Sequence, residues 1–127
     1  WANEGLQLIL DLGEWWNELT GLPLPLGGNV VKRSLGEETC LRVAEDIKHS
    51  IQHSLSNPES ALEFAKQWGR GIDDDTNREF VSMYVNRRTL DYGEDGREAV
   101  RRFLREGQRI GVIDTSFDVD GIEFVGS

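Results

Sequence analysis

Two histidines in this sequence have the side-chain type and the spacing that could bind a metal ion. His49 and His53 stand four residues apart, which places both imidazoles on one side of a helix, and Asp46 precedes them by one turn. Such a pair can share a metal ion. The residues between the histidines are Ser-Ile-Gln, however, so the His-Glu-x-x-His pattern is absent and no third strong ligand is evident. We interpret this face as a solvated polar surface rather than a metal site.

Three further groups have structural explanations. The run Asp73, Asp74 and Asp75 lacks the spacing of an EF-hand loop and suits the start of a helix. The sequence shows no base that would be oriented to activate the Cys40 thiol, so we predict that Cys40 packs in the core and does not act as a nucleophile. Four arginines recur on one helix side and could bind phosphate, but interleaved glutamates favour local ion pairs. These arginines are Arg97, Arg101, Arg105 and Arg109.

Composition narrows the class of partner. The 127 residues, 38% of them hydrophobic, suit one domain with one core. With 14 basic and 23 acidic residues the net charge is −9, which argues against nucleic acid or an anionic membrane and favours a small molecule. One cysteine excludes an internal disulfide, and no run reaches the length of a membrane span, so a cytoplasmic location is expected.

The first third of the chain is predicted to mix strands and helices. Residues 6–12 alternate loosely between two glycines, which indicates a strand, and residues 29–33 form a second one. Between them, residues 13–20 form a short helix that Gly21 ends. Two strands cannot form a stable sheet unaided, so we expect the missing strands to come from an upstream part of the same polypeptide or from another chain.

The remainder of the chain is predicted to be helical. Ser34 and Glu37 have the spacing of a capping box that opens a helix to about Ser56, and Pro58 suits the first position of the next helix. Two more helices start at the acidic run 73–75 and near Gly93, and residues 121–126 form a candidate edge strand. The apolar residues expected on the buried faces include Cys40, Ala44, Ile47, Ile51, Leu55, Ala61, Phe64, Ala65, Trp68, Phe80, Val81, Tyr84, Val85, Val100, Phe103 and Leu104.

The uncharged stretch "TGLPLPLGGN", Thr20 to Asn29, is predicted to be a stiff extended loop. Pro23 and Pro25 each fix φ and remove a backbone donor, which excludes a helix interior or a central strand. Gly27 and Gly28 permit a close approach of another group to the backbone. Two interpretations remain open: the leucines plug the core, or they line an apolar pocket.

One long run points to a known family. Residues 4–36, and above all "DLGEWWNELTGLPLPLGG" (11–28), closely resemble the 1,4-dihydroxy-6-naphthoate synthase family of the futalosine route to menaquinone. Residues 47–70 and 83–104, which contain the elements "YVN" and "LDYG", are similar to that family's helical second half. The likeness fades after Gly111. Chorismate dehydratase, the sister enzyme of the pathway, is the alternative.

The resemblance implies an α/β fold of the periplasmic-binding-protein type II kind, with two lobes around a cleft. Residues 1–57 would form the latter part of the second lobe, and residues 58–127 the helices that return to the first lobe and a C-terminal tail. The activity implied is a carbon-carbon lyase that converts cyclic dehypoxanthine futalosine without a metal or organic cofactor. Its histidine base is expected upstream of Trp1, so no catalytic residue is assigned here.

The resemblance also implies a binding surface. Leu24, Leu26 and Gly27, with Gly28, would form the apolar wall that faces the substrate, and Tyr84 and Asn86 are candidates for the cleft rim. The N-terminal half of the same fold would then complete the site, and the chain alone would be inactive. A solute-binding protein of the same fold that catalyses nothing, and a helical module that completes its sheet against a partner, are the alternatives from other classes.

Overall fold

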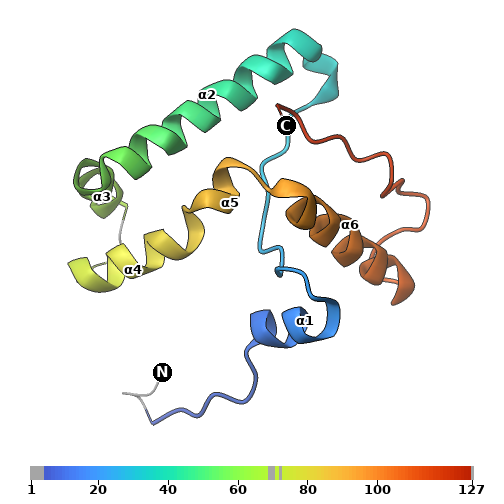
Figure 1. Cartoon of the computed structure of the whole chain (residues 1–127), viewed down its shortest axis with the longest axis horizontal. Helices are drawn as coiled ribbons and strands as arrows, with labels where there is room; N and C mark the ends of the chain where they lie inside the picture. Colours follow the sequence, from blue (N-terminus) through green and yellow to red (C-terminus); the bar gives the residue numbers. More distant parts are fainter. Residues whose placement is uncertain (1–4, 69–70, 72, 127) are drawn as a thin grey trace. The chain divides into compact units, whose positions relative to one another are not determined.

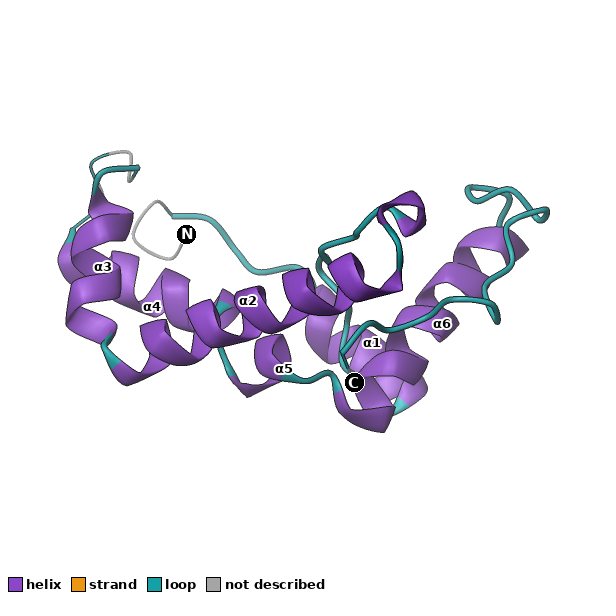
Figure 2. Ribbon diagram, turned by 90° about the horizontal axis from the view of Figure 1, so that it is seen from above, coloured by secondary structure: helices purple, strands orange, loops and turns teal. Residues whose placement is uncertain are grey.

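The structure is a computed structural model, which describes residues 5–68, 71 and 73–126. Its regular elements are α1 (Leu12–Thr20), a 3-10 turn η2 (Arg33–Leu35), α2 (Glu37–Ser56), α3 (Pro58–Lys66), α4 (Asp74–Tyr84), α5 (Arg87–Leu90) and α6 (Gly93–Arg109). Figure 1 shows their order along the chain. Helices and loops account for every described residue, and Figure 2 accordingly shows no strand there.

The α/β prediction, and with it the two-lobe fold with strands, is therefore wrong for the described chain, which is all helical. The strands predicted at residues 6–12, 29–33 and 121–126 are absent. The side chains in the first two segments also lie open, with Ile9 90% and Val30 97% exposed. An alternating pattern stabilises a strand only where a second strand satisfies its backbone donors and acceptors and a layer covers its apolar face. Neither is present in the described residues.

The predicted helices are confirmed, with two local corrections. The Asp11 carboxylate accepts hydrogen bonds from the backbone N–H groups of Gly13 (2.8 Å) and Glu14 (3.0 Å) at the start of α1, and Gly21 ends that helix at φ 71°. The capping box predicted at the start of α2 does not form, because Gly36 occupies the cap position and Ser34 lies in η2. The short helix α5 was not predicted.

The chain divides into two compact units. The first consists of residues 1–29 and 93–123, and thus holds α1, α6 and the segment that follows α6. Its buried side chains are Trp16 (4% exposed), Ala99 and Val119. Trp16 meets the edge of Phe103 on α6 with 5.6 Å between the ring centroids. The core of this unit is thus small and depends on one aromatic pair.

The second unit consists of residues 30–92 and 124–127. In it α2 contacts η2, α3 and α5, and α3 contacts α4. Cys40 and Leu62 are buried, in agreement with the packing role expected for Cys40. The apolar stripe predicted for α3 is wrong in part, since Phe64 and Trp68 are 63% and 77% exposed. Helical spacing identifies an apolar face correctly but does not supply the element that covers it.

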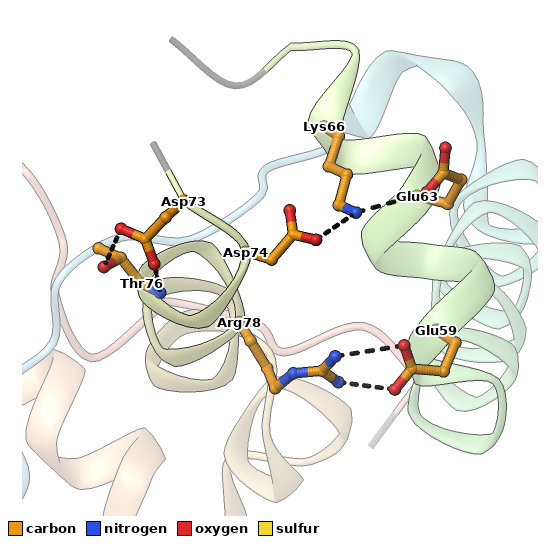
Figure 3. A network of polar contacts seen from close by, with 7 residues as sticks. All are labelled: Glu59, Glu63, Lys66, Asp73, Asp74, Thr76 and Arg78. Atoms are coloured by element: carbon orange, nitrogen blue, oxygen red, sulfur yellow. Dashed lines mark hydrogen bonds and ion pairs between the residues drawn. The ribbon is translucent and has the colours of Figure 1, made fainter. Parts of the chain in front are cut away.

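Polar contacts join α3 to α4 on the surface of the second unit (Figure 3). The Arg78 guanidinium donates two hydrogen bonds to the Glu59 carboxylate, at 2.8 and 3.2 Å, and Lys66 Nζ lies 2.8 Å from the Asp74 carboxylate. Asp73 caps α4, as predicted, by accepting from the Thr76 N–H at 3.0 Å. The hydrogen bond and charge of Arg78 hold the pKa of Glu59 below its usual value.

Candidate functional site

The loop of residues 20–29 is held by the end of α1. The Trp16 indole Nε1–H donates to the Pro23 carbonyl at 3.2 Å, and the Asn17 amide donates to the Leu22 carbonyl at 3.3 Å. The Thr20 hydroxyl donates to the Trp16 carbonyl at 2.7 Å and accepts from the Leu22 N–H at 3.1 Å. The bonds to Leu22 and Pro23 pair backbone groups that belong to no regular element, and so they fix the first half of the loop.

Trp16 has two roles in this arrangement. Its ring is buried against Phe103 in an edge-to-face contact with 71° between the ring planes, while its N–H reaches the loop. A buried tryptophan needs a partner for its indole N–H, and the carbonyl of Pro23 supplies one. Its neighbour Trp15 is 45% exposed, with its ring centroid 6.4 Å from that of Trp16. The adjacent pair therefore puts one ring into the core of the unit and leaves the other open.

The second half of the loop presents apolar side chains and bare backbone. Leu24 is half-buried, Leu26 is 74% exposed, and Gly27 and Gly28 are exposed. A Cβ added to Gly27 would meet nothing within 4 Å, and its φ is not in the left-handed region, so no strain requires glycine there. Leu26 thus does not plug the core of its unit. The surface that the loop offers is open to a ligand or to another part of a larger protein.

Tyr84 and Asn86 lie in the second unit, at the end of α4. Tyr84 is about half exposed, with its ring centroid 4.9 Å from that of Phe80. The side-chain Oδ1 of Asn86 accepts from the Arg88 N–H at 2.9 Å, and its side-chain Nδ2 donates to the Met83 carbonyl at 3.0 Å. The side chain of Asn86 is therefore occupied in capping α5, whereas the Tyr84 ring is accessible.

The two histidines lie on α2 in the second unit. Both are exposed, and the Nδ2 atom of Asn57 lies 3.5 Å from the Nδ1 atom of His53. In the part of the chain that the structure describes, no group of three or more histidine, cysteine or carboxylate side chains could hold a metal ion. His49 and His53 thus both lie at the surface of α2.

A small hollow in the first unit was missed by sequence reasoning. It has a volume of about 170 Å³ and lies between the end of α1 and α6, lined by Leu19, Thr20, Leu22, Glu98 and Arg102. Arg102 pairs with Glu106 at 3.0 Å, and Glu98 pairs with Arg105 at 3.1 Å. The spacing of these charges is visible in the sequence, but nothing there connects residues near 20 with residues near 100. The hollow is smaller than a typical pocket for a metabolite, which holds at least about 300 Å³.

Comparison with known proteins first identifies the family of this chain. The family model described as menaquinone biosynthesis matches residues 1–109, and the chain belongs to this family. The chain is 39% identical over 108 residues to a 1,4-dihydroxy-6-naphtoate synthase of Thermus thermophilus, and 33% identical over 113 residues to one of Streptomyces coelicolor. These matches cover 85% and 89% of this chain but 40% of each relative. The predicted resemblance is confirmed.

A solved structure agrees with this relationship. The chain matches protein AF1704 from Archaeoglobus fulgidus with a TM-score of 0.82 and 35% sequence identity, over 88% of this chain and 42% of that one. The chain therefore spans about two fifths of the length of the proteins that it matches. Among the helices of the described residues, none combines the length and apolar character that a membrane crossing requires.

Proposed function

We propose that this chain is part of an enzyme of menaquinone biosynthesis that makes 1,4-dihydroxy-6-naphthoate. The observation that carries the proposal is the identity of 33–39% to two synthases of that name over most of the chain. The reaction we propose is the lyase step on cyclic dehypoxanthine futalosine that the resemblance of residues 11–28 implies. Since the chain spans about 40% of each relative, the activity belongs to a protein that contains more than these residues.

We assign residues 24–28 the role of an apolar wall for the bicyclic part of the substrate. Leu26 is largely exposed and Gly27 leaves open space above the backbone, so a flat ring can approach both. Apolar contact of this kind contributes about 25 cal/mol per Å² of surface removed from water. Because α1 fixes residues 22 and 23 through Trp16 and its neighbours, the loop is anchored immediately before the wall, which limits the binding energy lost in ordering residues 24–28.

We assign the base that removes a proton to the part of the protein outside this chain. Proton abstraction beside a carbonyl needs a base within hydrogen-bond reach of the substrate and a site from which water is excluded. His49 and His53 are exposed on α2 and match no motif of the resemblance. The same missing part is our candidate for covering the apolar side chains of residues 6–10. All four of these side chains, those of Leu6, Leu8, Ile9 and Leu10, are more than half exposed.

A chimera tests the proposal. This chain would replace the matched 108 residues of the Thermus thermophilus relative, and turnover of cyclic dehypoxanthine futalosine would be measured by formation of 1,4-dihydroxy-6-naphthoate. We expect turnover by the chimera and none by this chain alone. A folded chimera that binds the compound without turnover would favour a solute-binding protein, and one that acts on chorismate instead would favour the dehydratase.

A further inference from the structure

The segment after α6 carries our further inference. We propose that residues 110–123, named here the strap, hold α6 in place and thereby position Trp16 and the loop of residues 20–29. The strap lies outside residues 1–109, which the family model matches. It belongs with α6 and α1 to the first unit. Its effect on α6 is independent of the proposed function, whereas any effect on ligand binding rests on that function.

The strap first closes the C-terminal end of α6. The N–H groups of Val112 and Ile113 both donate to the Gly107 carbonyl, at 2.9 and 3.1 Å, and the Gly111 N–H donates to the Gln108 carbonyl at 3.0 Å. Gly111 has a φ of 77°, which a residue with a side chain rarely adopts. The Ile113 side chain then lies on Gly107, where an added Cβ would come within 2.7 Å of Ile113 Cδ1. The absence of a side chain at position 107 lets the strap turn back tightly.

Side chains of α6 next hold the backbone of the strap. The Gln108 amide nitrogen donates to two strap carbonyls, those of Asp114 (3.0 Å) and Phe117 (2.8 Å). About two turns earlier on α6, Arg101 makes a longer hydrogen bond of 3.5 Å to the Ile122 carbonyl. One glutamine thus donates to two strap carbonyls, of which that of Asp114 also accepts from the Phe117 N–H at 3.1 Å, and these two bonds make Gln108 the principal contact between α6 and the strap.

An ion pair and a buried side chain complete the contact. Arg105 pairs with the Asp120 carboxylate of the strap and with Glu98 on α6, and the hydrogen bond to Asp120 raises the pKa of the Arg105 guanidinium. Val119 is 4% exposed and is the apolar anchor of the strap. Asp118 shapes the turn around it by accepting from the backbone N–H groups of Asp120 (3.1 Å) and Gly121 (3.0 Å).

The helix that the strap holds also supports the loop. Phe103 lies on α6 between the strap contacts at Arg101 and Arg105, and its ring meets Trp16. Trp16 in turn donates to the Pro23 carbonyl of the loop. A continuous series of contacts therefore runs from the strap through α6 and Trp16 to the loop. Gln108 is a positioning residue in this series, since it touches the strap and not the loop.

The test is Gln108→Met in the full chain, which keeps the length of the side chain and removes both donors. Hydrogen–deuterium exchange would be followed at the backbone amides of α6, together with exchange of the Trp16 indole N–H by NMR. We expect about tenfold faster exchange in the last turns of α6, because two hydrogen bonds are lost, and a smaller increase at the Trp16 indole. Gln52→Met, the same change on the exposed surface of α2, is the matched control and should change neither.

Asp120→Asn provides a second variant if Gln108→Met does not fold. It weakens the pair with Arg105 without touching α6, and exchange in α6 should rise by roughly two- to fivefold. Unchanged exchange in α6 would overturn the role of the strap. Faster exchange in α6 with an unchanged Trp16 indole would overturn the transmission to the loop. None of these measurements uses a ligand, so they are unaffected if the proposed function fails.

Discussion

Two non-helical segments of the first unit have opposite characters. Residues 6–11, before α1, are rich in leucine and isoleucine, yet the side chains of Leu6, Leu8, Ile9 and Leu10 are more than half exposed. The strap, after α6, carries more polar residues, yet it is fixed by hydrogen bonds from Gln108 and by the buried Val119. Hydrophobicity alone therefore does not place a segment inside this protein. A segment without regular structure is held where its backbone groups find partners.

The comparison also separates two kinds of surface. The apolar side chains of residues 6–10 are exposed, whereas the strap buries Val119 against its own unit. A contiguous exposed apolar segment of this kind marks an interface. We therefore expect changes at residues 6–10 to be neutral in this chain and costly in the chimera, and changes in the strap to be costly in both.

The largest effect expected is that of Val119→Asp. A carboxylate at a position that is 4% exposed would be buried without a partner, which costs at least about 2 kcal/mol in the free energy of unfolding. Ile9→Asp is the matched change in the other segment, and because Ile9 is 90% exposed it should shift stability by less than about 0.5 kcal/mol. Thermal unfolding of the two variants measures the difference. Equal losses of stability would remove the contrast between the segments.

The next effect concerns binding rather than stability. Leu26→Ser in the chimera should weaken binding of cyclic dehypoxanthine futalosine by about 1–3 kcal/mol, because it removes apolar contact from the proposed wall. Calorimetric titration would measure the affinity, and thermal unfolding should be unchanged since Leu26 is 74% exposed. Leu24→Ser, at a half-buried position, should lower both.

Gly27→Ala sharpens this prediction because the structure leaves space for a Cβ there. We expect no loss of stability, and a loss of affinity only if the ligand approaches the backbone. A strong fall in stability on Leu26→Ser, with normal binding by the protein that remains folded, would show that Leu26 is a core residue and contradict the wall.

Much of the helical structure could be predicted from the sequence, because its signals are local. The cap at Asp73, the proline at position 58 and the stop at Gly21 act within one helical turn, and the structure places helix ends at all three. The strands could not be predicted correctly from the alternation of residues 6–12, since a strand requires a partner at a distance that the pattern does not specify.

The same difference between local signals and contacts with distant residues applies to the candidate site. The proline and glycine content of residues 20–29 indicated a stiff, extended loop but left open whether its leucines plug the core or line a pocket, and only the family resemblance favoured the pocket. The support that Trp16 receives from Phe103 joins residues 87 positions apart, and no spacing rule connects them. The strap is held mainly through backbone carbonyls, which any sequence possesses, so only Gln108 and the glycines at its turns were visible signals, and they are too common to interpret alone.

Trp16→Phe tests the contact between α6 and the loop. Phenylalanine keeps an aromatic ring against Phe103 but removes the N–H that donates to the Pro23 carbonyl, and the loss should be about 1 kcal/mol in the free energy of unfolding. Trp15→Phe is the control, since that ring is 45% exposed, and it should change stability by less than about 0.5 kcal/mol. If Trp15→Phe costs as much as Trp16→Phe, the indole hydrogen bond does not hold the loop.

The smallest effect expected is the pH dependence of the joint between α3 and α4, a third region that polar contacts hold together. The pKa of Glu59 in the folded chain lies below its usual value of 4.5, chiefly because of the hydrogen bonds from Arg78. A lowered folded pKa means that the unfolded chain binds the proton more readily, so the contribution of this pair is present above pH 4.5 and is lost as the pH falls through the folded value. Since both side chains are exposed, the change in stability is small and should shrink further in high salt.

The contribution of the pair of Glu59 and Arg78 can be measured by amide exchange in α3 and α4 between pH 6 and pH 3, for the native chain and for Glu59→Gln. The glutamine variant should lack this part of the pH dependence, and identical profiles for the two proteins would mean that the pair does not stabilise the joint.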